Sequence, residues 1–265
     1  KVSLAHGLRK RPAVKLDIVT PTRNRLPFLR ENMTSVRQSR LSPLDLEIRQ
    51  LIHDCGSDDG TGDWLAQEAR ERDDFTLISS SHPIFPGEAR NMAIRKGSGE
   101  FIMPLDDDDI LLQRTAYHFV HALNGQPDAM WTVSDFIKID SEGRYLPGED
   151  YHGWVFDSAD DMLRGIFSGQ HYLQGNVCFR RSMFDKVGGY ASELKTAEDL
   201  ELYVRFLLEA GLPKYIPAVS HLHRVHNGNI SRNVDKHRYN RDMETIYRLH
   251  EPRLRARNIE LVLIP

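Results

Sequence analysis

Strand-like and helix-like segments alternate along the first half of the chain, and this alternation limits the possible folds most strongly. Short apolar segments have the composition of buried strands, and the segments between them have helical spacing or begin at a Gly/Asp turn. The expected strands are 14–21, 46–54, 75–80 and 100–106, and the expected helices are 26–39, 55–72 after its turn, and 87–97. Strands joined through helices at this spacing favour crossover connections and a parallel sheet.

The second half of the chain is less regular. A hairpin is expected around 141–143, and helices are expected over 157–167 and 197–211. We therefore expect a Rossmann-like α/β single domain over 16–250, with a mostly parallel central sheet flanked by helices. Its parts would be a first half (16–112) and a second half (113–231), between an N-terminal arm (1–15) and a C-terminal tail (251–265).

Composition excludes several other classes of protein. The chain has 265 residues, of which 40% are hydrophobic, and its net charge of −3 argues against a nucleic-acid partner. Its cysteines, Cys55 and Cys178, are too few for a disulfide scaffold or a thiolate zinc site. Because no apolar run of about 18 residues and no secretory signal is visible, a cytoplasmic location is expected. The basic and apolar ends leave peripheral membrane or adjacent-domain contact open.

Polar and flexible residues follow the expected strands at their carboxyl ends, in "TPTRN", "HDCGSDDGT" and "LDDDD". Ligands of parallel sheets bind beyond these ends. The four carboxylates Asp106–Asp109 need a compensating partner there, and a helix start would use only one or two of them. Mg²⁺ and Mn²⁺ take carboxylate oxygens and bind phosphates. A calcium loop of the helix–loop–helix type does not fit, because Ile110 and Tyr117 would occupy ligand positions.

Five motifs occur in a characteristic order between residues 16 and 231. They are "IVTPTRNR", "HDCGSDDGT", "ARNMAIRKGSGEFIMPLDDDD", "VGGYASELKTAEDLEL" and "RVHNGNIS". In this order the chain resembles the inverting family 2 glycosyltransferases of the GT-A fold. The resemblance implies transfer of a sugar from a nucleotide-diphosphate donor, most often a UDP-sugar, with Mn²⁺ or Mg²⁺ as cofactor.

The resemblance makes 16–112 the nucleotide-binding half and 113–231 the acceptor and catalytic half, and it also implies site residues. Asp199 would be the catalytic base. The donor would be bound by Thr20, Pro21, Arg23, Asn24, Asp54, Arg90, Asp106, Asp107 and Arg224. The metal would be bound by Asp106, Asp108 and His226. The acceptor would be a glycan, a lipid-linked molecule or a small molecule.

The chain departs from the family pattern at three positions. Arg23 stands where an aromatic residue often stacks on the base, although a guanidinium also stacks on flat rings. This departure leaves GDP and dTDP open beside UDP. Cys55 replaces the second acid of the usual turn, and Glu201 stands where aspartate is common.

The histidines of "HLHRVH" suggest a three-histidine metal site at first sight. Strand alternation would put His221 and His223 on one face and leave His226 beyond it, so only His226 is retained as a ligand. Two other functions stay open at this point. The fold could serve a non-catalytic nucleotide-sugar or glycan-binding module, and "DDDDI" comes close to the motif of haloacid dehalogenase-type phosphatases.

Overall fold

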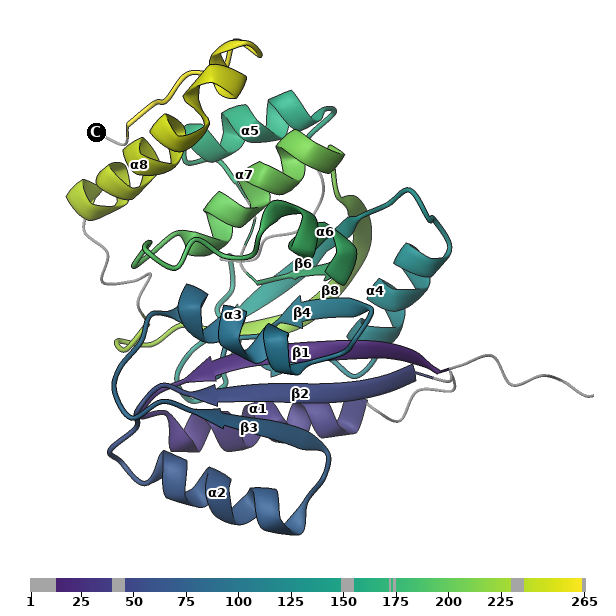
Figure 1. The fold of residues 1–265 in the computed structure, drawn as a ribbon, viewed down its shortest axis with the longest axis vertical. Helices are drawn as coiled ribbons and strands as arrows, with labels where there is room; N and C mark the ends of the chain where they lie inside the picture. Colours follow the sequence, from purple (N-terminus) through teal and green to yellow (C-terminus); the bar gives the residue numbers. More distant parts are fainter. Residues whose placement is uncertain are drawn as a thin grey trace, which may run out of the picture.

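The fold is built on a sheet whose strands β1 to β4 share one direction (Figure 1). The computed structural model describes residues 13–39, 46–148, 155–171, 173, 175–229 and 236–263. The strands are β1 (Val14–Thr22), β2 (Leu46–Asp54), β3 (Phe75–Ser79), β4 (Phe101–Pro104), β5 (Ile110–Leu111), β6 (Trp131–Ile139), β7 (Val177–Arg180) and β8 (Lys214–Arg224). The helices are α1 (Leu26–Ser39), α2 (Thr61–Glu71), α3 (Pro86–Lys96), α4 (Thr115–Asn124), α5 (Ala159–Phe167), α6 (Arg181–Val187), α7 (Glu198–Ala210) and α8 (Lys236–Arg255).

The order of the strands places the expected ligand-binding loops together. Across the described sheet the order is β3-β2-β1-β4-β7-β6-β8-β5. β7 is antiparallel to β4 and β6, and β8 runs parallel to β6. Because β1, β2 and β4 are parallel, the loops that follow them leave the same edge of the sheet. The expected α/β domain with a mostly parallel sheet is confirmed.

Helices cover both faces of the sheet. On one face α1 and α4 pack through Val36 and Phe119 against Ile18 and Met103, with α2 beside them next to β3. On the other face, α3, α6 and α7 join a larger core that includes Val19 and the buried Trp131. α5 packs on α7, and Figure 1 shows α8 on the outer side of this layer. Both faces of the sheet are therefore covered by packed helices.

Several segments differ from the sequence-based expectations. The segments with strong sequence patterns are predicted correctly, and α1 and β2 have the expected bounds. The expected hairpin near 141–143 is present in a short form, closed by the bridge between Ile139 and Tyr145 and by the backbone hydrogen bond from Leu146 to Lys138. α8 runs past residue 251, where the tail was expected to begin. Residues 1–12 of the expected arm lie outside the described residues.

The C-terminal segment docks on this fold without joining the sheet. Ile259 is fully buried, and the backbone N–H of Val262 donates to the carbonyl oxygen of Phe167 at 2.9 Å. Among the described helices, we find none with the length and apolar character needed to cross a membrane.

Candidate functional site

A cleft of about 710 Å³ opens at the carboxyl ends of β1, β2 and β4. The loop before α3, the first turn of α7 and the start of α8 complete its walls. Seven of the predicted site residues line it, namely Pro21, Arg23, Arg90, Asp106, Asp107, Asp108 and Asp199. The structure therefore brings the aspartate cluster and the predicted base, which are about 90 residues apart in sequence, to a common space.

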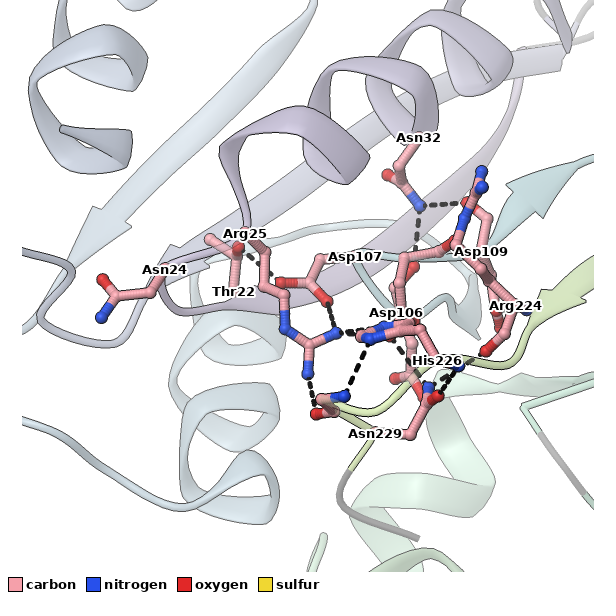
Figure 2. Close-up of polar contacts among 12 residues, drawn as sticks. Thr22, Asn24, Arg25, Asn32, Asp106, Asp107, Asp109, Arg224, His226 and Asn229 are labelled. Carbon is pink, nitrogen blue, oxygen red and sulfur yellow. Dashed lines mark hydrogen bonds and ion pairs between the residues drawn. The ribbon is translucent and has the colours of Figure 1, made fainter. Parts of the chain in front are cut away.

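A buried amide holds the aspartate loop in its conformation. Asn32, on α1, donates from Nδ2 to the carbonyl oxygens of Asp106 at 2.8 Å and Asp109 at 2.9 Å (Figure 2). Gln50 in turn donates to the Asn32 Oδ1 atom at 2.7 Å and to Thr20 Oγ1 at 3.0 Å. The loop is thus fixed through its backbone, which leaves the aspartate side chains available for other contacts.

The buried aspartates have opposite electrostatic environments. Burial and the neighbouring charge of Asp108 raise the pKa of Asp107 to about 8, although Thr22 Oγ1 donates to this carboxyl at 2.6 Å. Burial also acts on Asp108, but the hydrogen bond from His226 and the charge of Arg25 outweigh it and lower the pKa of Asp108. At neutral pH the negative charge of the pair therefore resides mainly on Asp108.

Three side chains converge on one carboxylate oxygen of Asp108. Arg25 donates to Asp108 Oδ2 at 2.6 Å, His226 Nε2 lies 2.9 Å from it, and Asn229 Nδ2 lies 3.2 Å from it. Figure 2 shows Arg25 reaching from the end of β1 toward His226 on the loop after β8. A second nitrogen of Arg25 donates to the carbonyl oxygen of Gly228, so Arg25 joins the two loops.

This arrangement is compatible with a divalent cation at Asp108. A carboxylate and an imidazole meet there, and a cationic guanidinium already lies between them, 2.6 Å from Asp108 and 2.9 Å from His226. His226 Nδ1 accepts from the backbone N–H of Gly228 at 3.0 Å, so its Nε2 carries the proton in the neutral ring. Metal binding through Nε2 would require that proton to move to Nδ1 and the bond from Gly228 to break.

Arg90 connects the aspartate loop to the first turn of α7. Its guanidinium donates to Asp106 at 2.6 Å and to Glu198 at 2.5 Å, and it lies over the ring of Tyr190 at 5.6 Å. Arg90 and Glu198 are both buried, so the ion pair between them is shielded from water, whereas the Asp106 side chain is partly exposed. The predicted base Asp199 follows Glu198 directly, and this bridge therefore sets its position relative to the aspartate loop.

Asp199 has the electrostatics of a group that can accept a proton near neutral pH. Burial and the neighbouring charge of Glu198 raise its pKa to about 7, while Arg90 opposes the rise. The residue before the helix, Ala197, has a φ of 59°, which is uncommon for a side chain with a Cβ. This sharp entry into α7 places both Glu198 and Asp199 on the wall of the cleft.

Four predicted donor-binding residues do not line the cleft and contact other groups of the protein. Thr20 is fully buried against Gln50, and Asn24 is paired with Asp58 through two hydrogen bonds of 2.7 and 2.9 Å. Asp54 accepts from the backbone N–H and hydroxyl of Ser57. Arg224 is 1% exposed, donates to the backbone of Asp108 and pairs with Glu31 at 2.6 Å. Phosphate contact by Arg224 would need the buried guanidinium to leave these partners.

The sequence profile described as "Glycosyl transferase family 2" matches residues 17–188 of the chain. The chain belongs to this family. A GalNAc(5)-diNAcBac-PP-undecaprenol beta-1,3-glucosyltransferase of Campylobacter jejuni is 32% identical over 176 residues, which are 64% of this chain and 53% of that one. An uncharacterized protein of Sinorhizobium fredii is 25% identical over 191 residues, and the match spans 20% of its length.

Solved structures share the fold of this family 2 glycosyltransferase. TarS residues 1–349 of Staphylococcus aureus, in complex with UDP-GlcNAc, has a TM-score of 0.67 at 18% identity. The mannosyltransferase PcManGT of Pyrobaculum calidifontis, in complex with GDP-Man and Mn²⁺, has a TM-score of 0.64 at 17% identity. The matches cover 88% and 92% of this chain and 65% of each solved chain.

Three residues of the site were not singled out from the sequence of this family 2 glycosyltransferase. Arg25, Asn32 and Asn229 contact the aspartate loop from segments 70 to 120 residues away in sequence. Arg25 and Asn229 do lie inside the quoted motifs "IVTPTRNR" and "RVHNGNIS". The helical spacing of 26–39 gave no signal for Asn32, because a single polar residue on a buried helix face has no motif of its own.

Proposed function

We propose that this family 2 glycosyltransferase transfers a sugar, with inversion, from a UDP-sugar to an acceptor hydroxyl in a metal-dependent reaction. Asp199 would be the general base. The observation that carries the proposal is Arg90, whose two ion pairs connect the aspartate loop at Asp106 to Glu198 beside the base. A donor diphosphate near Asp108 and an acceptor near Asp199 would then face each other across one cleft.

The reaction consists of one displacement at the anomeric carbon. As the acceptor oxygen forms its bond to this carbon, its proton passes to the Asp199 carboxylate, which typically contributes about 10²- to 10⁴-fold to the rate. The bond from the anomeric carbon to the β-phosphate oxygen breaks, and the diphosphate leaves with the electron pair. Attack from the side opposite to the leaving group inverts the configuration.

The donor would lie along the end of β1 and the aspartate loop. Pro21 and Arg23 line the cleft, and the guanidinium of Arg23 is suited to stack on the base. We propose that Thr20, Asn24 and Asp54 act by shaping the two loops that receive the base. Asp106, whose side chain is 46% exposed, can meet the ribose or diphosphate, with Arg90 supplying a fixed positive charge behind it.

Mn²⁺ or Mg²⁺ would be held by Asp108, with His226 and Asp106 as further ligands. When bound, such an ion stabilises the charge of a leaving diphosphate. For this chain's own residues, the proposal means that Arg25 must move away from Asp108, because its guanidinium lies 2.6 Å from the ligand oxygen. Support comes from the mannosyltransferase neighbour, whose structure contains Mn²⁺.

The acceptor would enter on the side formed by α8 and the loop before α3. This wall includes the aromatic residues Phe85 and Tyr239, with Lys195 lying 5.5 Å over the ring of Phe85. Aromatic faces beside cations are suited to the apolar faces and hydroxyls of a sugar. We propose that a glycan, lipid-linked or small-molecule acceptor binds along this wall.

The family assignment decides between the functions that the sequence had left open. A haloacid dehalogenase-type phosphatase is excluded, since the family and the fold are those of glycosyltransferases. The raised pKa of the cleft carboxyl Asp199 favours an enzyme over a purely binding module.

Calorimetric titration tests the donor half of this proposal. UDP, GDP and dTDP are each titrated with Mn²⁺ and then with EDTA, in the parent protein and in Asp108→Ala. Binding of UDP that needs Mn²⁺ and weakens in the variant is expected. Metal-dependent binding of GDP or dTDP alone would reassign the nucleotide. Equal binding with EDTA would overturn the metal dependence.

A further inference from the structure

We propose that Asp109, His221 and His223 form a second metal site, specific for Zn²⁺, separate from the Asp108 site. The strand register brings these residues together. β5 is antiparallel to β8, with Ile110 opposite Leu222 and Leu111 opposite His221, so Asp109 comes beside His223. Their candidate ligand atoms, two imidazole nitrogens and a carboxylate oxygen, all lie within 4.8 Å of one another.

The two separations from the Asp109 carboxylate are close to those between ligands in a tetrahedral zinc site. Asp109 Oδ2 lies 3.5 Å from His221 Nε2, and the Asp109 carboxylate lies 3.4 Å from His223 Nδ1. Ligands bound to zinc at about 2.0 to 2.1 Å in tetrahedral geometry lie roughly 3.3 to 3.4 Å apart. A direct hydrogen bond between such groups would usually be about 2.7 to 3.2 Å long. His223 Nδ1 makes only a long hydrogen bond of 3.4 Å to Asp109 and His221 Nε2 makes none, so the spacing suits an ion between the groups.

The other ring nitrogen of His221 has a partner that can orient the ring. Ser220 Oγ lies 3.1 Å from the carbonyl oxygen of Asp135 and 2.9 Å from His221 Nδ1, and when its proton points to the carbonyl oxygen it accepts from His221 Nδ1. Metal-bound histidines are typically oriented by such a bond from the second ring nitrogen. In the neutral ring, Nε2 then carries a lone pair and no proton.

This lone pair lacks a partner in the described protein. His221 is fully buried, its Nε2 has no hydrogen-bond partner among the described residues, and it faces the Asp109 carboxylate. Two electron-rich groups at 3.5 Å repel each other inside the protein, and an unpaired buried acceptor is costly. A cation bound to both would remove both costs.

The chemistry of the three donors favours zinc over the ion expected for the diphosphate. Mg²⁺ and Mn²⁺ prefer oxygen ligands, whereas two imidazoles and one carboxylate are a common ligand set for Zn²⁺. Phe136, stacked 5.4 Å from His221, shields one side of the site. His223 also lines the donor cleft, which gives the ion a path to the site.

Cobalt and zinc binding by the full chain test this proposal. After removal of metals with a chelator, the His226→Ala variant, in which the Asp108 site has lost its imidazole, is titrated with Co²⁺ and Zn²⁺. We expect one equivalent of Zn²⁺ to bind, and Co²⁺ to give the visible absorption bands of a tetrahedral complex. His221→Phe keeps an aromatic ring beside Phe136 and should lower zinc affinity by at least about tenfold, the smallest loss typical for a site that loses a supporting group.

The outcome of the zinc test does not depend on the outcome of the donor-site test. Mn²⁺-dependent UDP binding should survive in His221→Phe and weaken in Asp108→Ala, so failure of either proposal is recognised on its own. The zinc proposal is overturned if the His226→Ala protein binds no zinc and shows no tetrahedral cobalt spectrum. It is also overturned if a protein with His221→Phe has an unchanged circular dichroism spectrum and binds zinc as tightly as the same protein without this substitution.

Discussion

The guanidinium of Arg25 donates to the same oxygen of Asp108 that His226 contacts, at 2.6 Å and 2.9 Å respectively. A protein cation thus lies at the carboxylate that the proposed function assigns to a metal ion. Asp108 is 6% exposed, and an uncompensated charge at such a position would be costly. Arg25 therefore stabilises the aspartate loop in the nucleotide-free protein and competes there with a divalent ion.

Replacing Arg25 by glutamine should tighten Mn²⁺ binding in the absence of nucleotide. A hydrogen bond between charged groups contributes about 1.5 to 3 kcal/mol, so loss of this competitor should raise Mn²⁺ affinity by about tenfold or more. Calorimetric titration with Mn²⁺ measures the effect. Arg23→Gln is the matched control, since it removes the same charge from the same cleft. A lower Mn²⁺ affinity in Arg25→Gln would show that Arg25 supports the metal site instead.

Asp199→Asn should abolish most turnover while donor binding persists. The amide keeps the size of the side chain and cannot accept the acceptor proton, so kcat should fall by about 10²- to 10⁴-fold. Glu201→Gln is the control on the same helix, because Glu201 pairs with His250 and Arg205 outside the cleft. Turnover assays and UDP titration measure the two effects. If Asp199→Asn lost UDP affinity as strongly as it lost turnover, Asp199 could not act only as the base.

The rate should depend on pH through the same carboxyl. A base with a pKa of about 7 is active when deprotonated, so kcat/KM should rise with pH and reach half of its maximum near pH 7. Glu198 raises this pKa by its charge, so Glu198→Gln should move the midpoint to lower pH. The pH–rate profiles of the parent protein and of Glu198→Gln measure the two midpoints. An unchanged midpoint in the variant would remove Asp199 as the titrating group.

Stability should depend on pH in a predictable direction because of Asp107. Its pKa is raised from 3.8 to about 8 on folding, so the folded state retains a proton that the unfolded state has lost. The free energy of unfolding should therefore fall as pH rises from about 4 to 8. Asp107→Asn should flatten this slope and leave the acceptor for Thr22 in place. Denaturant unfolding in the presence of EDTA at pH 5 and pH 8 measures how the free energy of unfolding changes with pH. An equal change in Asp107→Asn would contradict the prediction.

The sequence predicted the parts of the fold that have strong local patterns. The spacing of Leu29, Met33 and Val36 is that of a buried helix face, and the whole apolar segment 46–54 forms β2. β7 and β8 were harder to predict, because their pairing with β6 depends on contacts between segments far apart in sequence. Local propensity carries no information on such pairing.

The site was predicted as a set of residues rather than as a geometry. The family motifs indicated Asp108 and His226, and the structure places His226 Nε2 2.9 Å from Asp108 Oδ2. The motif also predicted Arg224 in the donor site, and the structure adds what the motif does not show, namely that Arg224 is buried against Asp108 and Glu31. Burial of a cation depends on which acids the fold brings to it, and a single sequence does not report this.

Arg90 provides the last test, because it holds the two halves of the cleft together. Arg90→Met keeps the length of the side chain and removes its charge, which leaves the buried Glu198 without its partner. Loss of one partner of a buried ion pair typically costs about 3 to 5 kcal/mol. Adding Glu198→Gln should recover much of this loss, because the remaining uncompensated charge is then gone. Denaturant unfolding of the two single variants and the double variant measures the coupling. If the three changes in unfolding free energy are simply additive, Arg90 and Glu198 do not act as a pair, and the bridge between the aspartate loop and α7 is not what positions Asp199.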